Sequence, residues 1–168
     1  MIIFETKRLI IRQYIFNTDA ENFFLLNGNE DVMRYIRPVK AKEECDAFLK
    51  EIILNEKENP GLSRWAAIEK ESNEFVGSFA IIPIAGTDDI QLGFALLPAY
   101  WGKGFASELT KAGLDYYFST TNANHIYAIT EEPNIASQKV LLKNGFVRAG
   151  TKTEGEKDLF RFIFRKSN

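Results

Sequence analysis

The chain has 168 residues, a length that predicts a single domain, 1–168, with enough interior to bury a sizeable core. Its 45% hydrophobic and 26% charged residues are typical of a globular protein, so extended disorder, collagen and coiled coil are excluded. A near balance of 21 basic and 23 acidic residues, with no basic block, argues against nucleic acid as a partner.

The spacing of apolar residues predicts both strands and helices. Residues 8–14 alternate in type, as in a strand, whereas residues 42–55 carry Leu49, Ile52 and Ile53 at helical spacing. In chain order, we expect a strand at 8–14, helices at 19–26 and 42–55, strands at 65–69, 75–84 and 89–97, a helix at 104–118, a strand at 125–130, a helix at 134–144 and strands at 146–150 and 159–164.

This order combines strands that follow one another directly with strands joined through helices. Direct succession favours antiparallel neighbours, and a helical crossover favours parallel ones. The sequence therefore predicts an α+β (mixed α/β) fold, in which helices cover both faces of a mixed sheet. No internal repeat, low-complexity tract or linker divides the chain.

The apolar stretches are too short to span a bilayer. The two longest, at residues 79–86 and 94–102, each contain a proline and fall well below the roughly 20 residues that a spanning helix needs. A membrane is therefore not an expected partner. The first residues alternate apolar and charged side chains, unlike a signal peptide, so we predict a cytoplasmic location.

Cys45 and His125 are the single cysteine and the single histidine. A disulfide within the chain needs two cysteines, and a zinc site needs several such ligands, so neither a disulfide nor a metal site is expected. We expect Cys45 to pack in a helix as a small apolar side chain and His125 to open a strand at the surface.

Residues 98–106 form the most informative segment, directly after one predicted strand and directly before a predicted helix. Gly102 and Gly104 leave the backbone uncovered, so that its N–H groups and the positive helix end are able to meet an anion closely. The spacing does not fit a Rossmann fingerprint, because Ser107 stands where Gly or Ala is needed, and no hydroxyl follows as in a nucleotide P-loop. From this segment alone, a glycine turn that only connects two elements is an equally good interpretation.

A second segment, residues 133–146, changes that balance. Residues 101–106 resemble motif A of the GNAT superfamily of acetyl-CoA-dependent N-acetyltransferases, Gln/Arg-x-x-Gly-x-Gly/Ala, although Trp101 departs from the usual Gln or Arg. Motif B of that superfamily is an Asn, a small residue three positions later, and Gly-Phe at eleven and twelve. The residues that match motif B are Asn134, Ser137, Gly145 and Phe146.

Residues 100–106, Tyr-Trp-Gly-Lys-Gly-Phe-Ala, are similar to the RimJ/RimL-like branch, which contains ribosomal-protein N-terminal acetyltransferases. Residues 5–12 resemble the first strand of that branch and residues 75–77 its third, so the resemblance covers nearly the whole chain. It implies a GNAT fold, with a central, mostly antiparallel sheet of six to seven strands and about four helices. Homodimers are common in this branch, although the sequence identifies no interface.

The resemblance implies acetyl-CoA as the cosubstrate and an amine as the acceptor, with no metal. The pyrophosphate would lie on the backbone of residues 102–106, and the pantetheine between residues 91–97 and 125–130. The backbone near Leu96 would pair with the pantetheine and polarise the thioester carbonyl, as preorganised N–H donors do in other acyl-transfer sites. Asn134 precedes a predicted helix, so it is also expected to be an N-cap. The residues assigned to the cosubstrate are Leu96, Leu97, Trp101, Gly102, Lys103, Gly104, Phe105, Ala106, Asn134 and Ser137.

The resemblance also implies the catalytic candidates. Many relatives carry a Tyr acid seven residues after the motif B Asn, where this chain has Leu141, so Ser137 is the remaining candidate near the sulfur. Many carry a Glu base where this chain has Gln91, which does not accept a proton at neutral pH. Asp89, on the same side of the strand, would act through a water instead. Two alternatives, interpreted as surface charges, are Glu131 and Glu132.

The missing Glu favours an acceptor with a low pKa. An α-amine, with an ordinary pKa of about 7.7–8.0, is partly neutral near physiological pH, whereas a lysine amine at about 10.4 is almost wholly protonated. We therefore expect direct attack by a peptide N-terminus or an amino acid derivative, without an acetyl-enzyme at Cys45. A non-catalytic acyl-CoA-binding regulator is the alternative, favoured by Gln91 and Leu141. The residues expected to line the acceptor site are Arg34, Tyr35, Arg37 and Trp65.

Overall fold

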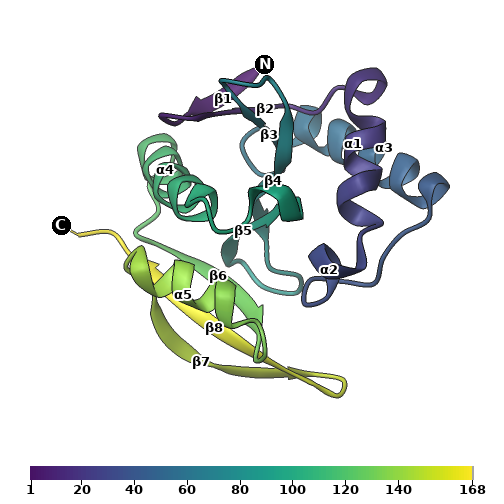
Figure 1. Ribbon diagram of the computed structural model, residues 1–168. Helices are drawn as coiled ribbons and strands as arrows, with labels where there is room; N and C mark the ends of the chain where they lie inside the picture. Colours follow the sequence, from purple (N-terminus) through teal and green to yellow (C-terminus); the bar gives the residue numbers. More distant parts are fainter. Residues whose placement is uncertain (168) are drawn as a thin grey trace.

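The computed structural model describes residues 1–167 and is built on one sheet with the strand order β1-β2-β3-β4-β5-β6-β8-β7 (Figure 1). Neighbouring strands are antiparallel except β5 and β6, which are parallel. The strands are β1 (Ile2–Glu5), β2 (Leu9–Arg12), β3 (Arg64–Glu69), β4 (Phe75–Pro83), β5 (Ile90–Leu96), β6 (His125–Glu131), β7 (Val147–Glu154) and β8 (Lys157–Arg165). The helices are α1 (Phe16–Asn27), α2 (Glu30–Met33), α3 (Lys42–Glu58), the 3-10 helix η1 (Pro98–Tyr100), α4 (Phe105–Thr120) and α5 (Ile135–Lys143).

The predicted class, an α+β fold with a mixed, mostly antiparallel sheet, is confirmed. Two short elements, β1 and α2, were not predicted, so the described residues form eight strands rather than six to seven and five α-helices rather than about four. Each has four residues, which is too few to show a period. The one-turn helix α2 depends on its cap, because the Asn29 side chain accepts hydrogen bonds from the N–H groups of Asp31 and Val32.

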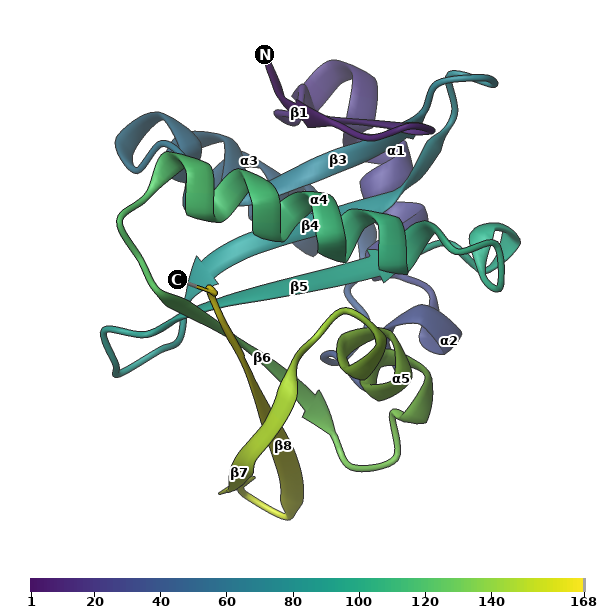
Figure 2. The same cartoon turned by 90° about the vertical axis from the view of Figure 1, so that its left-hand side faces the viewer.

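Helices cover both faces of the sheet, with α4 on one face and α1 and α3 on the other (Figure 2). Alternation along β3 divides its side chains between two cores: Trp65 and Ala67 pack on the α4 side, and Ala66 and Ile68 on the α1–α3 side. Cys45 lies wholly buried in the second core, as expected. Within residues 1–167, none of the helices is long and apolar enough to cross a membrane.

The close approach of α4 to the sheet depends on Gly113. A Cβ built at this position would overlap the ring of Phe79 on β4. The helix backbone therefore rests directly on an aromatic side chain, which fixes how far α4 and its N-terminal end stand from the sheet.

The parallel pair β5 and β6 separates along its length. The two strands are paired at Gln91 and Tyr127 and diverge toward their carboxyl ends, with α5 beside the opening (Figure 2). The other edge of β6 remains paired with β8 from His125–Arg165 to Glu131–Leu159. Because β6 follows β8 and leaves β5, a gap opens inside the sheet.

Candidate active site

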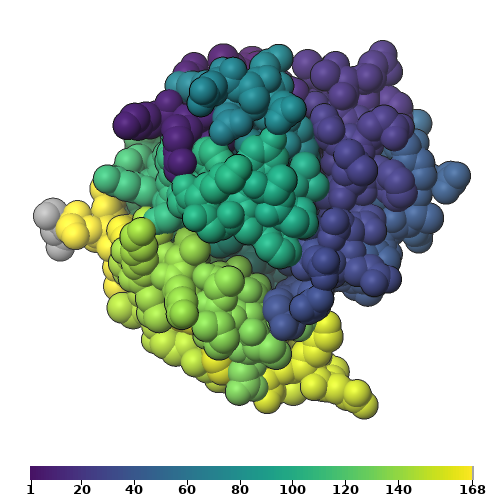
Figure 3. Space-filling view, in the orientation of Figure 1, coloured from purple at the N-terminus to yellow at the C-terminus, as the bar shows by residue number. Residues whose placement is uncertain are grey.

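A cavity of about 530 Å³ opens where β5 and β6 diverge. Its walls come from β4, β5, β6 and α5, from the segment after α2 and from the β7–β8 hairpin. The hairpin belongs to the C-terminal part of the chain, which packs as a green and yellow body against the teal and purple remainder (Figure 3). The cavity is thus enclosed by parts of the chain that are distant in sequence. We call it the central cavity.

The backbone of β5 presents hydrogen-bonding groups to the gap. The Leu97 N–H donates to the Val76 carbonyl oxygen of β4 at 2.9 Å, so this donor points away from β6 and is already used. Because successive residues alternate in direction, the N–H and C=O groups of Leu96 and Phe94 point the other way, toward the gap. The Leu96 carbonyl oxygen accepts a hydrogen bond from the Trp101 indole N–H at 2.8 Å, so this acceptor is already used. Of these two residues, Phe94 lines the central cavity.

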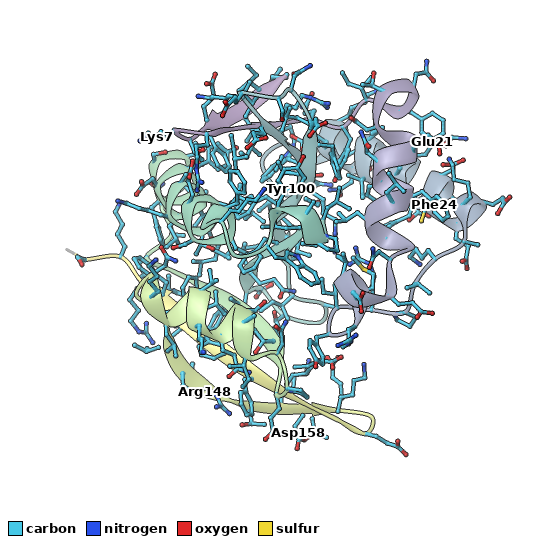
Figure 4. The ribbon with its side chains drawn as sticks, viewed as in Figure 1. Lys7, Glu21, Phe24, Tyr100, Arg148 and Asp158 are labelled. Atoms are coloured by element: carbon cyan, nitrogen blue, oxygen red, sulfur yellow. The ribbon has the colours of Figure 1, made fainter. Side chains whose placement is uncertain are left out.

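The glycine-rich turn between η1 and α4 has a backbone that other residues would not adopt easily. Gly102 and Gly104 have φ values of 71° and 82°, in the left-handed region that favours glycine. The turn ends at Phe105, where the first N–H groups of α4 have no partner within the helix. Tyr100, labelled near the middle of Figure 4, marks its start. These donors and the helix dipole favour an anion such as a pyrophosphate.

Arg8 and Glu108 hold this turn against the start of the sheet. The Arg8 guanidinium donates to the Lys103 carbonyl oxygen at 2.9 Å and to the Glu108 carboxylate at 2.7 Å. The same carboxylate accepts from the Thr6 hydroxyl and from the Arg8 backbone N–H. Desolvation raises the pKa of Glu108, but these hydrogen bonds and the charge of Arg8 together outweigh it and lower that pKa.

Helix α5 places the motif B residues on the wall of the central cavity. Asn134 and Ser137 both line the cavity, and the Asn134 side-chain oxygen accepts a 3.3 Å hydrogen bond from the Ser137 N–H, so Asn134 is also the expected N-cap. Leu141 lines the same wall and is 2% exposed. At the far end of the helix, the Asn144 side-chain amide donates to the Ser107 hydroxyl at 2.9 Å, which ties α5 to α4.

The acidic residues lie differently from the expectation. Gln91 lines the central cavity, but Asp89 does not; its carboxylate contacts Arg161 at 3.3 Å and His125 at 3.9 Å. Glu131, interpreted above as a surface charge, is only 14% exposed and lines the cavity, with Lys157 at 2.6 Å. The interpretation of Glu131 as a surface charge is therefore wrong, because the β7–β8 hairpin folds over it.

Of the four predicted acceptor-side residues, Tyr35 and Arg37 line the cavity. Arg34 points outward and pairs with Asp31 at 2.7 Å, with more than half of its side chain exposed. Trp65 is wholly buried on the α4 side, where its indole N–H donates to Glu56 at 2.9 Å. The predictions for Arg34 and Trp65 as acceptor-lining residues are therefore corrected. Strand alternation places Arg64, the neighbour of Trp65, on the cavity face instead.

Comparison with known proteins identifies the family. Residues 8–147 match the acetyltransferase (GNAT) domain family. The chain is 31% identical over 151 residues to the uncharacterised N-acetyltransferase YoaA of Bacillus subtilis, covering 88% of this chain and 84% of YoaA. A GNAT-family acetyltransferase from Bacillus anthracis superposes with a TM-score of 0.83 at 27% identity over 98% of both chains. The RimL ribosomal L7/L12 α-N-protein acetyltransferase in complex with coenzyme A shares the fold, with a TM-score of 0.82 at 18% identity over 99% of this chain and 98% of that one.

The chain therefore belongs to the GNAT acetyltransferase family and is an N-acetyltransferase. The family implies acetyl-CoA as the acyl donor, and the residues present fit this molecule. The positive-φ glycine turn offers uncovered N–H groups for a pyrophosphate. Beyond its pairing with β6 at Gln91, β5 presents the backbone of Phe94 to the gap, where an extended amide-containing arm has room to pair.

Proposed function

We propose that this enzyme transfers the acetyl group of acetyl-CoA to a primary amine, either a peptide N-terminal α-amine or a small-molecule amine, by direct attack. The observation that carries the proposal is the divergence of β5 and β6 into a cavity with walls of different kinds. The α5 wall carries the motif B residues. The opposite wall, which includes Tyr35 and Arg64, is free for an acceptor.

The glycine turn and β5 would bind and orient the donor. The N–H groups of residues 102–106 would hold the pyrophosphate, with Trp101 and Lys103 at its edge. The backbone of Leu96 and Phe94 would pair with the pantetheine arm, as an added strand pairs with an open sheet edge. Acetyl-CoA supplies an acetyl group activated as a thioester, whose carbon–sulfur bond breaks as the carbon–nitrogen bond forms.

Glu131 is the cavity carboxylate best placed to take the proton that the amine loses. It is mostly buried, lines the cavity and is held by Lys157. Gln91, in the position where many relatives carry a Glu base, would only orient the amine or a water by hydrogen bonding. An acceptor amine with an ordinary pKa of about 8 is already partly neutral, so a modest base is sufficient.

Ser137 would deliver a proton to the departing sulfur. Its hydroxyl lines the cavity in the first turn of α5, and Leu141, one turn further on, offers no acid. Because a serine hydroxyl is itself a weak acid, Ser137 would pass on a proton from a water in the cavity.

A second candidate function is an acyl-CoA-binding regulator without turnover, which the apolar Leu141 and the neutral Gln91 favour. The test is free thiol release from acetyl-CoA with a panel of peptides, amino acids, polyamines and aminoglycosides, followed by the mass of each product. We expect one amine class to gain a single acetyl group. Acetyl-CoA binding, seen as a rise in melting temperature, without product from any amine would favour the regulator. If acetyl-CoA did not bind, both functions would be rejected.

A further inference from the structure

Two arginines on the acceptor wall of the central cavity have no acidic partner. Arg37 follows α2 and Arg64 opens β3, and both line the cavity. Within residues 1–167 neither guanidinium forms an ion pair; Arg37 donates to the side-chain oxygen of Asn27 at 2.7 Å, and its Nε is buried without a hydrogen-bond partner.

Both guanidinium groups pack against the ring of Phe48, on α3. The guanidinium carbons of Arg37 and Arg64 lie 5.3 and 5.5 Å from the centroid of this ring. An aromatic ring attracts cations at this distance but does not neutralise them. The contact thus places both positive charges beside one side chain, and it uses none of their N–H donors, of which Arg37 gives one to Asn27.

Burial of two like charges is unfavourable without an anion. Desolvation, and then the charge of Arg37, lower the pKa of Arg64 to about 10. Desolvation also lowers the pKa of Arg37. Both groups stay protonated near neutral pH, so the fold carries an electrostatic cost that a bound anion would relieve.

Within residues 1–167, the other charged side chains that line the cavity are already paired with one another. Glu131 contacts Lys157 at 2.6 Å, and Glu154 contacts Lys152 at 3.0 Å, both at the side of the β7–β8 hairpin. The excess positive charge of the cavity therefore resides in the two arginines on the opposite side, although the whole chain has a net charge of −2.

The sheet register joins this positive side to the place of reaction. Arg64 pairs with Ala80 of β4, and Ala80 pairs with Gly93 of β5, so the three residues form one row across the cavity floor. Strands are spaced by about 4.8 Å, which puts Arg64 roughly 10 Å from the backbone of Gly93. Ala80 and Gly93 have small side chains or none, so they leave room for a short molecule that reaches from the arginines to the gap beside β5.

We infer that the acceptor is a short primary amine that carries an anionic group, a carboxylate or a phosphate, and that Arg37 and Arg64 bind this group. The inference rests on the proposed function and specifies its substrate class. Guanidinium groups bind both anions through paired hydrogen bonds. The amine end then points toward β5 and Glu131. The arginines at one side of the cavity and the carboxylate at the other thus orient the acceptor from both ends.

The test compares amines with and without the anionic group, with each initial rate expressed per concentration of neutral amine, because the anionic group also changes the pKa of the amine. Amino acids are paired with their carboxamides, 2-aminoethyl phosphate with ethanolamine, and spermidine represents polycations. We expect kcat/KM to be about tenfold or more higher for the anionic member of at least one pair, since hydrogen bonds to a charged group are strong. The preferred pair identifies the anion as carboxylate or phosphate.

Variants assign the preference to the arginines. Arg64→Met and Arg37→Gln are each expected to reduce the rate ratio toward one while leaving the dissociation constant of acetyl-CoA unchanged. Arg64→Lys is expected to retain part of the preference. Lys50→Met, which removes an exposed cation from α3, is the control and should leave the ratio as in the wild type. Melting temperatures confirm that each variant is folded.

The outcomes separate the two claims. Turnover of neutral or cationic amines as fast as their anionic partners would overturn the inference and leave the proposed function standing. A preference for anions that survives both arginine substitutions would also overturn it. Acetyl-CoA binding without acetylation of any amine would reject the proposed function, and the inference with it.

Discussion

The guanidinium of Arg8 lies 4.2 Å from the ring centroid of Phe105, the first residue of α4, while its Nε donates to Glu108 one turn later. Arg8 stands just before β2, so this contact joins the amino-terminal edge of the sheet to the glycine turn almost a hundred residues away. The turn is thereby held in place before any ligand binds. This reduces the entropy that is lost when an anion binds, because the turn does not have to become ordered at that moment.

Glu108→Gln is expected to destabilise the protein by about 1–3 kcal/mol at pH 7, because it removes the charge that accepts three hydrogen bonds. The folded pKa of Glu108 is lowered, so its stabilisation is fully present above the ordinary glutamate value of about 4.3 and is lost as pH falls through the folded value. Urea unfolding of both proteins at several pH values measures this. The exposed Glu71→Gln is the control, and a difference that stays constant down to pH 3 would contradict the account.

Gly113→Ala is expected to lower stability by about 1–3 kcal/mol, because the added methyl overlaps the ring of Phe79 and the core has no free space for it. The usual gain in helix propensity from Gly to Ala is smaller than this cost. The matched control is Gly93→Ala, where a Cβ would meet no atom of residues 1–167 within 4 Å. Thermal unfolding should separate the two variants, and an unchanged melting temperature for Gly113→Ala would contradict the close contact of α4 with the sheet.

Glu131→Gln is expected to reduce kcat/KM for the acceptor more at pH 7 than at pH 9. At the lower pH most of the amine is protonated and needs a base, whereas at the higher pH it is already neutral. The pH profile of the variant, compared with that of Glu132→Gln on the exposed neighbour, is the measurement. A uniform loss across the range would indicate that Glu131 only supports the hairpin through Lys157.

Ser137→Ala is expected to lower kcat by roughly a hundredfold, the low end of what a positioned proton donor contributes. The dissociation constant of acetyl-CoA should change little, since the N–H of residue 137 and its hydrogen bond to Asn134 remain. Single-turnover rates at saturating acetyl-CoA and acceptor provide the measurement. Unchanged rates would mean that water alone protonates the sulfur.

The long periodic elements could be predicted from the sequence, and the short or tertiary features could not. Helices α3 and α4 extend over several turns, so their apolar spacing is clear, whereas β1 and α2 have four residues each, which is two strand repeats or about one helical turn. The turn around Gly102 was found because positive φ and an uncovered backbone both require glycine.

The acceptor wall shows why the remaining site residues were missed. The sequence predicts Trp65 as an acceptor-lining residue, but strand alternation buries it and turns Arg64 toward the cavity. Glu131 has a second acidic residue beside it, a pattern that predicts a surface charge. The sequence does not show that the β7–β8 hairpin folds back over Glu131. The divergence of β5 from β6 is likewise a property of sheet assembly, not of either strand.

The central claim is that donor and acceptor meet at β5 across the floor of the central cavity, and Gly93→Leu tests it directly. A Cβ at this position would meet no atom of residues 1–167 within 4 Å, and Gly93 lines the cavity, so the melting temperature should not fall. We predict that amine turnover falls by about tenfold or more, because the reacting groups are misplaced, while acetyl-CoA, held mainly at the turn and the strand edge, binds within about threefold of the wild type. If the Gly93→Leu variant acetylated the amine at the wild-type rate, the claim would be contradicted.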